Sequence, residues 1–155
     1  MNTSPVKILN QKQYQGLQKL GDSFIPGDLE LPRFSKLGCA EHVDTPLEEM
    51  SSNDLKDLKL LLTVLSFLPN IIIVLFLYSL ELFYRLPGPL SGQIRFIRMG
   101  IKGLVVSLYY SGKSGKSYQG KGIHEIIGYS ASVYTGDLDQ SNHNFDHNHG
   151  KSSQF

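Results

Sequence analysis

The sequence predicts a mostly α-helical fold: a single domain of about four to six helices over residues 1–136, followed by a polar tail over residues 137–155. Several segments place apolar residues at the three- and four-residue spacing of a helix face. Capping residues and Pro–Gly pairs separate these segments, and a length of 155 residues suits one domain. We expect an irregular, loop-rich C-terminal part. We also expect a disordered tail, because Asn, His, Ser and Asp dominate it.

The composition limits the classes of function. The chain carries 15 basic and 14 acidic side chains, so it lacks the basic excess typical of nucleic-acid binders, and we expect no nucleic-acid partner. Cys39 is the single cysteine, which excludes an internal disulfide and a multi-cysteine zinc site. Residues 1–20 show neither the apolar core of a secretory signal nor a twin-arginine pair.

The first 50 residues predict short helices joined by turns. Asn10 and Gln13 have the spacing of a capping box, and Pro26–Gly27 ends the apolar series that follows it, Tyr14, Leu17, Leu20 and Phe24. A less regular apolar series comes next, at Phe34, Leu37, Ala40 and Val43. Pro46, followed by two glutamates, then predicts a new helix start, because proline suits the first helical position and acidic residues suit the first turn.

The middle of the chain is strongly apolar. Residues 60–80 form 21 consecutive positions without a charge, and 15 of them are Leu, Ile, Val or Phe. Such a run reaches the usual length of a membrane-spanning helix, about 18 residues or more. Pro69 interrupts it, however, and predicts two helices, at about 54–67 with Ser52 as N-cap and at about 70–85. The second is apolar on almost all sides and should be buried in the core, a partner or a bilayer; its short length favours protein.

A last long helix is predicted from about Ile94 to Tyr110, after a Pro–Gly–Pro break and before Gly112 as the terminating glycine. It has an apolar face and, on another side, a basic stripe formed by Arg95, Arg98 and Lys102. The stripe suits an acidic partner or anionic headgroups, although a solvated helix face is the more frequent explanation. Glycines at 100 and 103 lower helix propensity, which predicts the close approach of another element.

No catalytic or cofactor-binding residues emerge from the pattern. Residues 111–117, SGKSGKS, copy the end of a phosphate-binding loop, but Tyr110 stands where the motif needs its first glycine, which favours a basic loop without nucleotide. Imidazoles in the tail suit zinc, nickel or copper. They are weak metal candidates, because a tail without apolar anchors cannot fix their geometry. These candidates are His143, His147 and His149.

Three segments, taken in order, resemble the small subunit of membrane-associated flavoprotein dehydrogenases, the gluconate 2-dehydrogenase subunit 3 type. The first is residues 20–27, LGDSFIPG, similar to that family's leading helix with its Asp and Pro. The other two are residues 108–112, LYYSG, and residues 127–129, IGY. The resemblance spans about residues 13–129, but its middle matches only as apolar helices.

The resemblance implies a non-catalytic subunit that binds and stabilises a large oxidoreductase subunit of the glucose–methanol–choline type. That partner would carry FAD and the chemistry, and a cytochrome subunit would take the electrons. This chain would bind no cofactor itself. Its partner interface is predicted at six residues: Arg95, Arg98, Lys102, Tyr109, Tyr110 and Tyr129. The sequence departs from the family in lacking any Arg–Arg pair, so we expect cytoplasmic or inner-membrane-associated residence. The alternative function is a small integral membrane protein anchored by residues 60–80, with no redox partner.

Overall fold

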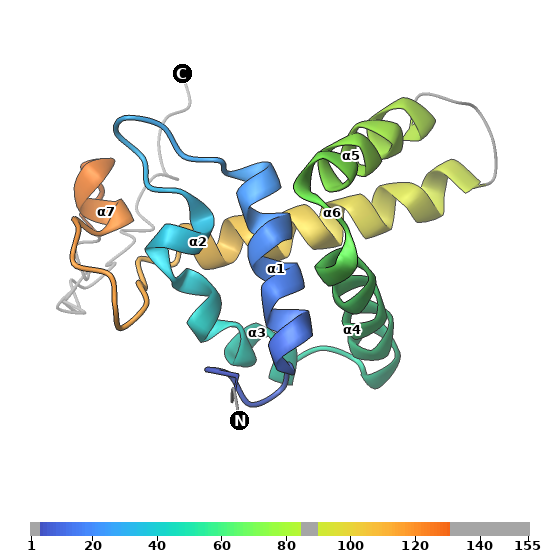
Figure 1. Ribbon diagram of the computed structural model, residues 1–155, viewed down its shortest axis with the longest axis horizontal. Coiled ribbons are helices and arrows are strands. Elements are labelled where there is room, and N and C mark those ends of the chain that lie inside the picture. Colours follow the sequence, from blue (N-terminus) through green and yellow to red (C-terminus); the bar gives the residue numbers. More distant parts are fainter. Residues whose placement is uncertain (1–3, 85–89, 131–155) are drawn as a thin grey trace, which may run out of the picture.

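The computed structural model describes residues 4–84 and 90–130, with side chains described throughout except at 80–94 and 96. It confirms a mostly helical domain (Figure 1). Within the described residues, four long helices carry the architecture; two short helices and a 3-10 turn connect the first two of them, and a third short helix follows the last. In chain order the elements are α1 (Gln11–Phe24), α2 (Phe34–Leu37), η1 (Cys39–His42), α3 (Asp44–Glu48), α4 (Ser52–Phe67), α5 (Asn70–Tyr84), α6 (Leu90–Tyr109) and α7 (Ile123–Ile126).

Helix α1 begins and ends where its sequence signals predict. The Asn10 side-chain oxygen accepts a hydrogen bond from the Gln13 amide at 2.9 Å, and the Gln13 side chain accepts from the Asn10 amide at 3.0 Å. This reciprocal pair satisfies two amides that the first helical turn cannot satisfy itself. The helix ends at Phe24, two residues before Pro26.

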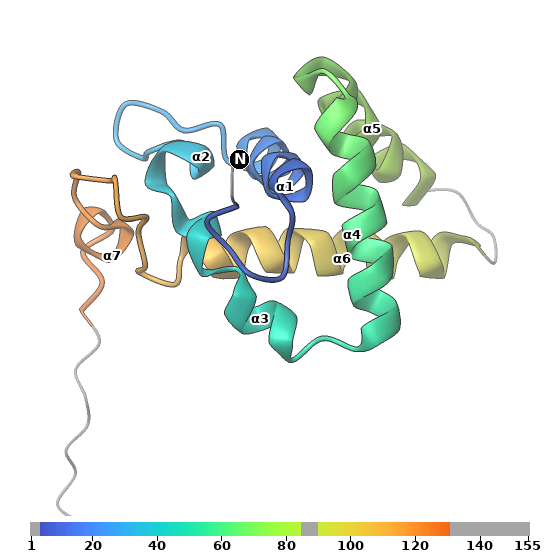
Figure 2. The ribbon, with the colours of Figure 1, turned by 60° about the horizontal axis from the view of Figure 1, so that its bottom comes forward.

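Helices α1 and α4 pack at very short range (Figure 2). A side-chain carbon placed on Gly16 would overlap the backbone carbonyl of Leu62. Only glycine allows this approach, because it has no Cβ. The crossing forms one side of the core, in which Leu17, Leu62 and Leu65 are fully buried.

The apolar run is divided at Pro69, as predicted. Helix α4 ends at Phe67 and α5 starts at Asn70. The N-cap of α4 is Ser51, whose hydroxyl accepts from the Asp54 amide, and the prediction of Ser52 was wrong by one residue. Proline offers no N–H to the carbonyls at the end of α4. Lys19 compensates, because its ammonium donates to the carbonyls of Ser66 at 2.6 Å and Leu68 at 2.9 Å.

Helix α6 joins the core through its second half. Its buried residues are Ile101, Leu104, Val105, Leu108 and Tyr109, and Gly112 ends the segment in the left-handed conformation (φ 74°), as predicted. Helix α6 also packs against α5. These two helices form an antiparallel hairpin that projects beyond the rest of the domain (Figure 1).

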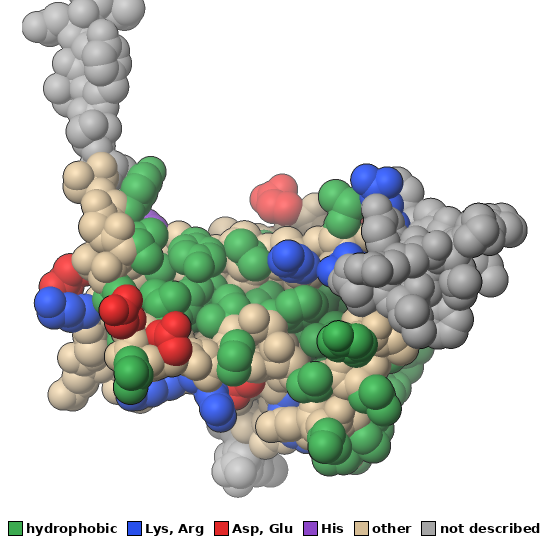
Figure 3. All heavy atoms as spheres, turned by 90° about the horizontal axis from the view of Figure 1, so that it is seen from above, with side chains coloured by type: hydrophobic (Ala, Val, Ile, Leu, Met, Phe, Trp, Pro, Cys, Tyr) green, Lys and Arg blue, Asp and Glu red, His purple; other side chains and the backbone are tan. Residues whose placement is uncertain are grey.

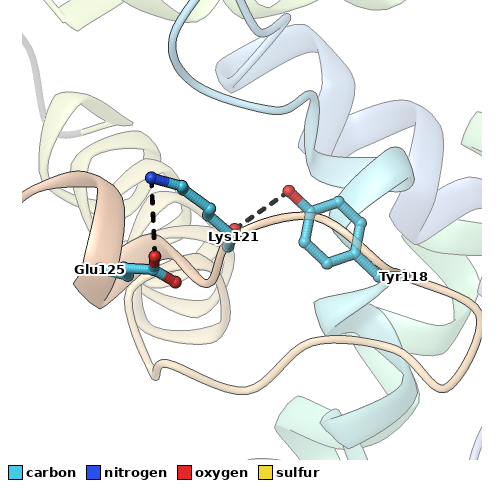
Figure 4. Close-up of polar contacts among 3 residues, drawn as sticks. All are labelled: Tyr118, Lys121 and Glu125. Atoms are coloured by element: carbon cyan, nitrogen blue, oxygen red, sulfur yellow. Dashed lines mark hydrogen bonds and ion pairs between the residues drawn. The ribbon is translucent and has the colours of Figure 1, made fainter.

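The part of the chain after α6 is irregular, as predicted, but it is tied to the core. The Gly115 amide donates to the Leu37 carbonyl at 2.9 Å, and the Lys116 amide donates to a Glu41 carboxylate oxygen at 3.1 Å. Closer to α7, the Tyr118 hydroxyl donates to the Lys121 carbonyl, and the Lys121 ammonium lies 3.7 Å from the Glu125 carboxylate (Figure 4). The tail, residues 137–155, lies outside the described residues.

Candidate partner-binding surface

Helix α5 exposes apolar side chains along one face. Ile71, Leu75 and Tyr78 follow each other at helical spacing and are 78%, 68% and 75% exposed. Among the described side chains of α5, only Ile73 is fully buried. The chain's own core therefore covers only part of the described face of this helix, through Ile73 and Leu77, and the side that carries Ile71, Leu75 and Tyr78 is left uncovered.

The exposed region continues onto α4. Hydrophobic side chains gather over the end of the molecule that carries α5 (Figure 3). We define the α4–α5 apolar face by its exposed members, Leu60, Val64, Phe67, Ile71, Ile72, Val74, Leu75 and Tyr78. Soluble monomers rarely expose contiguous apolar patches beyond a few hundred Å². Each large apolar side chain gains about 1.5–3 kcal/mol when it is fully buried, so this face is suited to binding.

A groove of about 730 Å³ opens between α4, α5 and α6. We call it the α4–α6 groove. Its wall is mostly apolar, and Asp54 and Asp57 from the first turns of α4 add two carboxylates. The described residues that line it are Met50, Asp54, Asp57, Leu58, Leu61, Phe76, Ile97, Gly100, Ile101 and Leu104. The sequence analysis missed this groove, because these residues come from three helices and from the connection before α4, and no local pattern reveals how these segments pack together.

Gly100 and Gly103 of α6 do not meet another described element. Among the residues that the structure describes, nothing lies within 4 Å of the position a Cβ would take at either glycine, so the predicted close approach is wrong there. The two glycines differ in their position relative to the α4–α6 groove. Gly100 lines the α4–α6 groove, whereas Gly103 is not among the groove residues.

The predicted basic stripe is a real surface feature. Arg95, Arg98 and Lys102 come together with Met99 around a shallow depression of about 260 Å³ on α6. Arg95 and Lys102 are exposed, and Arg98 is half-buried. The exposed charges of Arg95 and Lys102 beside this depression make it suited to an acidic group.

The predicted tyrosines separate into one core residue and two surface residues. Tyr109 is fully buried, and its hydroxyl donates to the Pro32 carbonyl at 2.6 Å. Removal from water raises the pKa of Tyr109 to about 12, because burial disfavours the phenolate. Tyr110 and Tyr129 are exposed. Tyr109 therefore stabilises the domain, while the other two remain on the surface.

His124 joins the last two segments of the family resemblance. Its Nε2 lies 2.8 Å from the Tyr110 carbonyl oxygen, and its ring meets the Tyr129 ring edge to face at 5.1 Å. Gly128 adopts the left-handed conformation (φ 68°) just before Tyr129. The segments at 108–112 and 127–129 are thus neighbours in space, and His124 has a structural role there.

The remaining predicted sites receive no support as ligand sites. The Gly115 and Lys116 amides are bonded to Leu37 and Glu41, so they do not point at an anion as they would in a phosphate-binding loop. No group of three His, Cys, Asp or Glu residues is placed to hold a metal within residues 4–84 and 90–130. His143, His147 and His149 lie outside the described residues.

Cys39 gives a direct test of the packing around η1. Its thiol is fully buried, and desolvation raises its pKa to about 12. We expect native protein at about pH 8 to resist a thiol-specific reagent, because the thiolate is the reactive form and is scarce far below the pKa. The same reagent should label one thiol per chain in denaturant. Fast labelling of the native protein would contradict the packing described here.

The geometry defines a small helical protein with an exposed apolar face, an apolar groove and a basic depression. Comparison with protein-family models, curated proteins and solved structures finds no match to this chain. Over the part of the chain that the structure describes, no helix combines the length and apolar character that crossing a bilayer requires.

Proposed function

We propose that this chain is a non-catalytic subunit that binds and stabilises a large FAD-dependent oxidoreductase subunit of the glucose–methanol–choline type. The observation that carries the binding role is the α4–α5 apolar face, whose Ile71, Leu75 and Tyr78 are each more than two-thirds exposed. The identity of the partner rests on the sequence resemblance at residues 20–27, 108–112 and 127–129.

The other surface features suit the same role. The depression around Arg95, Arg98 and Lys102 would pair with acidic side chains at the edge of the contact, where charges mainly set orientation and association rate. Helix α5 carries the larger part of the apolar face, and the neighbouring helix α6 carries this depression. Burial of such a face stabilises a partner only while the two proteins are bound.

The first test is isolation of the tagged chain from its native host. We expect a larger protein to co-purify in fixed ratio and to carry the visible absorption of flavin. A cytochrome in the complex would add a haem spectrum. Recovery of the chain alone, as a monomer without a flavin-containing protein, would contradict the proposal.

Alkaline carbonate extraction distinguishes the membrane-anchor alternative. A subunit held only by protein contacts should pass into the supernatant, because the treatment removes peripheral proteins from membranes. An anchor formed by residues 60–80 would keep the chain in the pellet, and that result would support the alternative function.

A further inference from the structure

We propose that the α4–α6 groove receives an amphipathic helix of the partner that carries basic side chains beside its apolar stripe. This inference rests on the proposed function, because the helix is assigned to the partner subunit. It goes further by naming the docking site and the chemistry of the segment that fills it. Helix-in-groove recognition is a common way of burying an apolar face.

The size and lining of the groove fit such an occupant. Its volume is about 730 Å³, and eight of the ten described residues that line it are apolar or glycine. Ile101 and Leu104 at its base are already buried in the isolated chain. An incoming helix with leucine-like residues on one stripe would therefore gain hydrophobic free energy mainly at Ile97, which is 53% exposed, and at the half-buried Leu58 and Leu61.

Gly100 marks the place of closest approach. A glycine inside a helix costs up to about 1 kcal/mol relative to alanine. No described residue occupies the space beside Gly100, so packing among the described residues does not explain the missing side chain. A second helix seated in the groove would explain it, because the absent Cβ lets another backbone approach α6 closely.

The carboxylates determine the charge of the occupant. Asp54 and Asp57 lie three residues apart at the start of α4, and both side chains are exposed and line the groove. Lys or Arg on the flank of the incoming helix would pair with them, whereas Asp or Glu would be repelled. The same carboxylates disfavour the anionic headgroups of a membrane surface, so charge favours a protein segment over a lipid one.

The test uses a synthetic helix of about 20 residues, long enough to hold helical structure in water. It carries leucines at positions i, i+3, i+4 and i+7, lysines beside that stripe, and one tryptophan on the opposite face. The chain contains no tryptophan, so the fluorescence anisotropy of the peptide reports binding without interference. A second peptide has every lysine replaced by glutamate.

Two glycine variants form a matched pair. Gly100→Leu fills the groove, whereas Gly103→Leu adds the same side chain to the same helix outside it. We expect saturable binding of the lysine peptide to the wild type and to Gly103→Leu, and binding at least tenfold weaker to Gly100→Leu. Thermal unfolding should show that both variants are folded, since both have open space at the substituted position.

The carboxylates are tested separately. The glutamate peptide should bind the wild type about tenfold more weakly than the lysine peptide, and Asp57→Asn should reduce that difference. Glu30→Lys, an exposed substitution outside the groove, should leave the preference unchanged.

Four outcomes would overturn the inference. They are no saturable binding of the lysine peptide, equal effects of the two glycine variants, equal binding of the two peptides, and a dimer in sedimentation that Gly100→Leu abolishes. Groove-dependent binding to phosphatidylcholine vesicles without peptide binding would assign the groove to lipid and equally overturn it. If the lysine peptide does not bind while a flavoprotein co-purifies, the docking site is wrong and the proposed function stands. If the lysine peptide binds in the groove while no flavoprotein co-purifies, the proposed function is wrong and the groove still binds a basic amphipathic helix.

Discussion

Gly16→Val is expected to unfold the protein or to destabilise it by about 3 kcal/mol or more. A side-chain carbon at this position would overlap the backbone carbonyl of Leu62, and a backbone group cannot rotate away as a flexible side chain can. To relieve the overlap, α1 and α4 must separate, and the separation would expose Leu17, Leu62 and Leu65, which are now fully buried. The free energy of unfolding of a domain is only about 5–15 kcal/mol, so this loss is a large share of it.

Far-UV circular dichroism during urea unfolding measures the change. The matched control is Gly103→Ala, which also replaces a helical glycine but in open space. It should stabilise the protein by up to about 1 kcal/mol, because alanine has the higher helix propensity. A Gly16→Val protein as stable as the wild type would show that α1 and α4 do not pack at the distance described here.

The difference between these two glycines shows what the sequence could predict. Composition and spacing correctly predicted the helix class, the α1 capping box, the break at Pro69 and the left-handed Gly112 that follows the end of α6 at Tyr109. Each of these depends on residues a few positions apart. The glycine that permits a close helix crossing is Gly16, whereas the sequence analysis assigned that role to glycines at 100 and 103. The local sequence does not distinguish these three glycines, because the residue that packs against Gly16, Leu62, is distant along the chain.

The same limit applies to the candidate binding surface. The basic stripe was predictable, since Arg95, Arg98 and Lys102 share one side of a single helix. The exposure of α5 was not, because a helix that is apolar on all sides has no preferred face in the sequence. Lys19 was also missed; it caps the end of α4 from a position almost 50 residues earlier in the chain.

Exposure also changes the expected effect of charged substitutions on α5. For a helix buried on all sides, as the apolar sequence of residues 70–85 indicates, aspartate at Val74 or Phe76 would abolish folding or assembly. Val74 is 48% exposed and Phe76 is partly buried. At Val74 a charge can remain in water in the isolated chain, so folding should survive and only assembly should be lost. Folding and assembly are thus separable at the α4–α5 apolar face.

Leu75→Glu is expected to block assembly with the partner while leaving the fold of the isolated chain intact. Leu75 is 68% exposed, and glutamate is a good helix former, so the isolated chain should keep its helix content and nearly its full stability. In the proposed complex the carboxylate would be buried against an apolar surface without a partner. That costs about 3–5 kcal/mol, which corresponds to an affinity for the flavoprotein subunit weakened by about 10²- to 4 × 10³-fold.

The recovery of flavin absorbance with the tagged chain measures this loss, and thermal unfolding of the isolated variant checks its fold. The matched control is Leu29→Glu in the loop between α1 and α2, where the leucine is fully exposed (105%) and outside the α4–α5 apolar face. It introduces the same charge and should leave flavoprotein recovery unchanged. If Leu75→Glu folds normally and still recovers the flavoprotein in full, the partner does not bind through α5, because no buried interface of this kind tolerates an unpaired carboxylate at its centre.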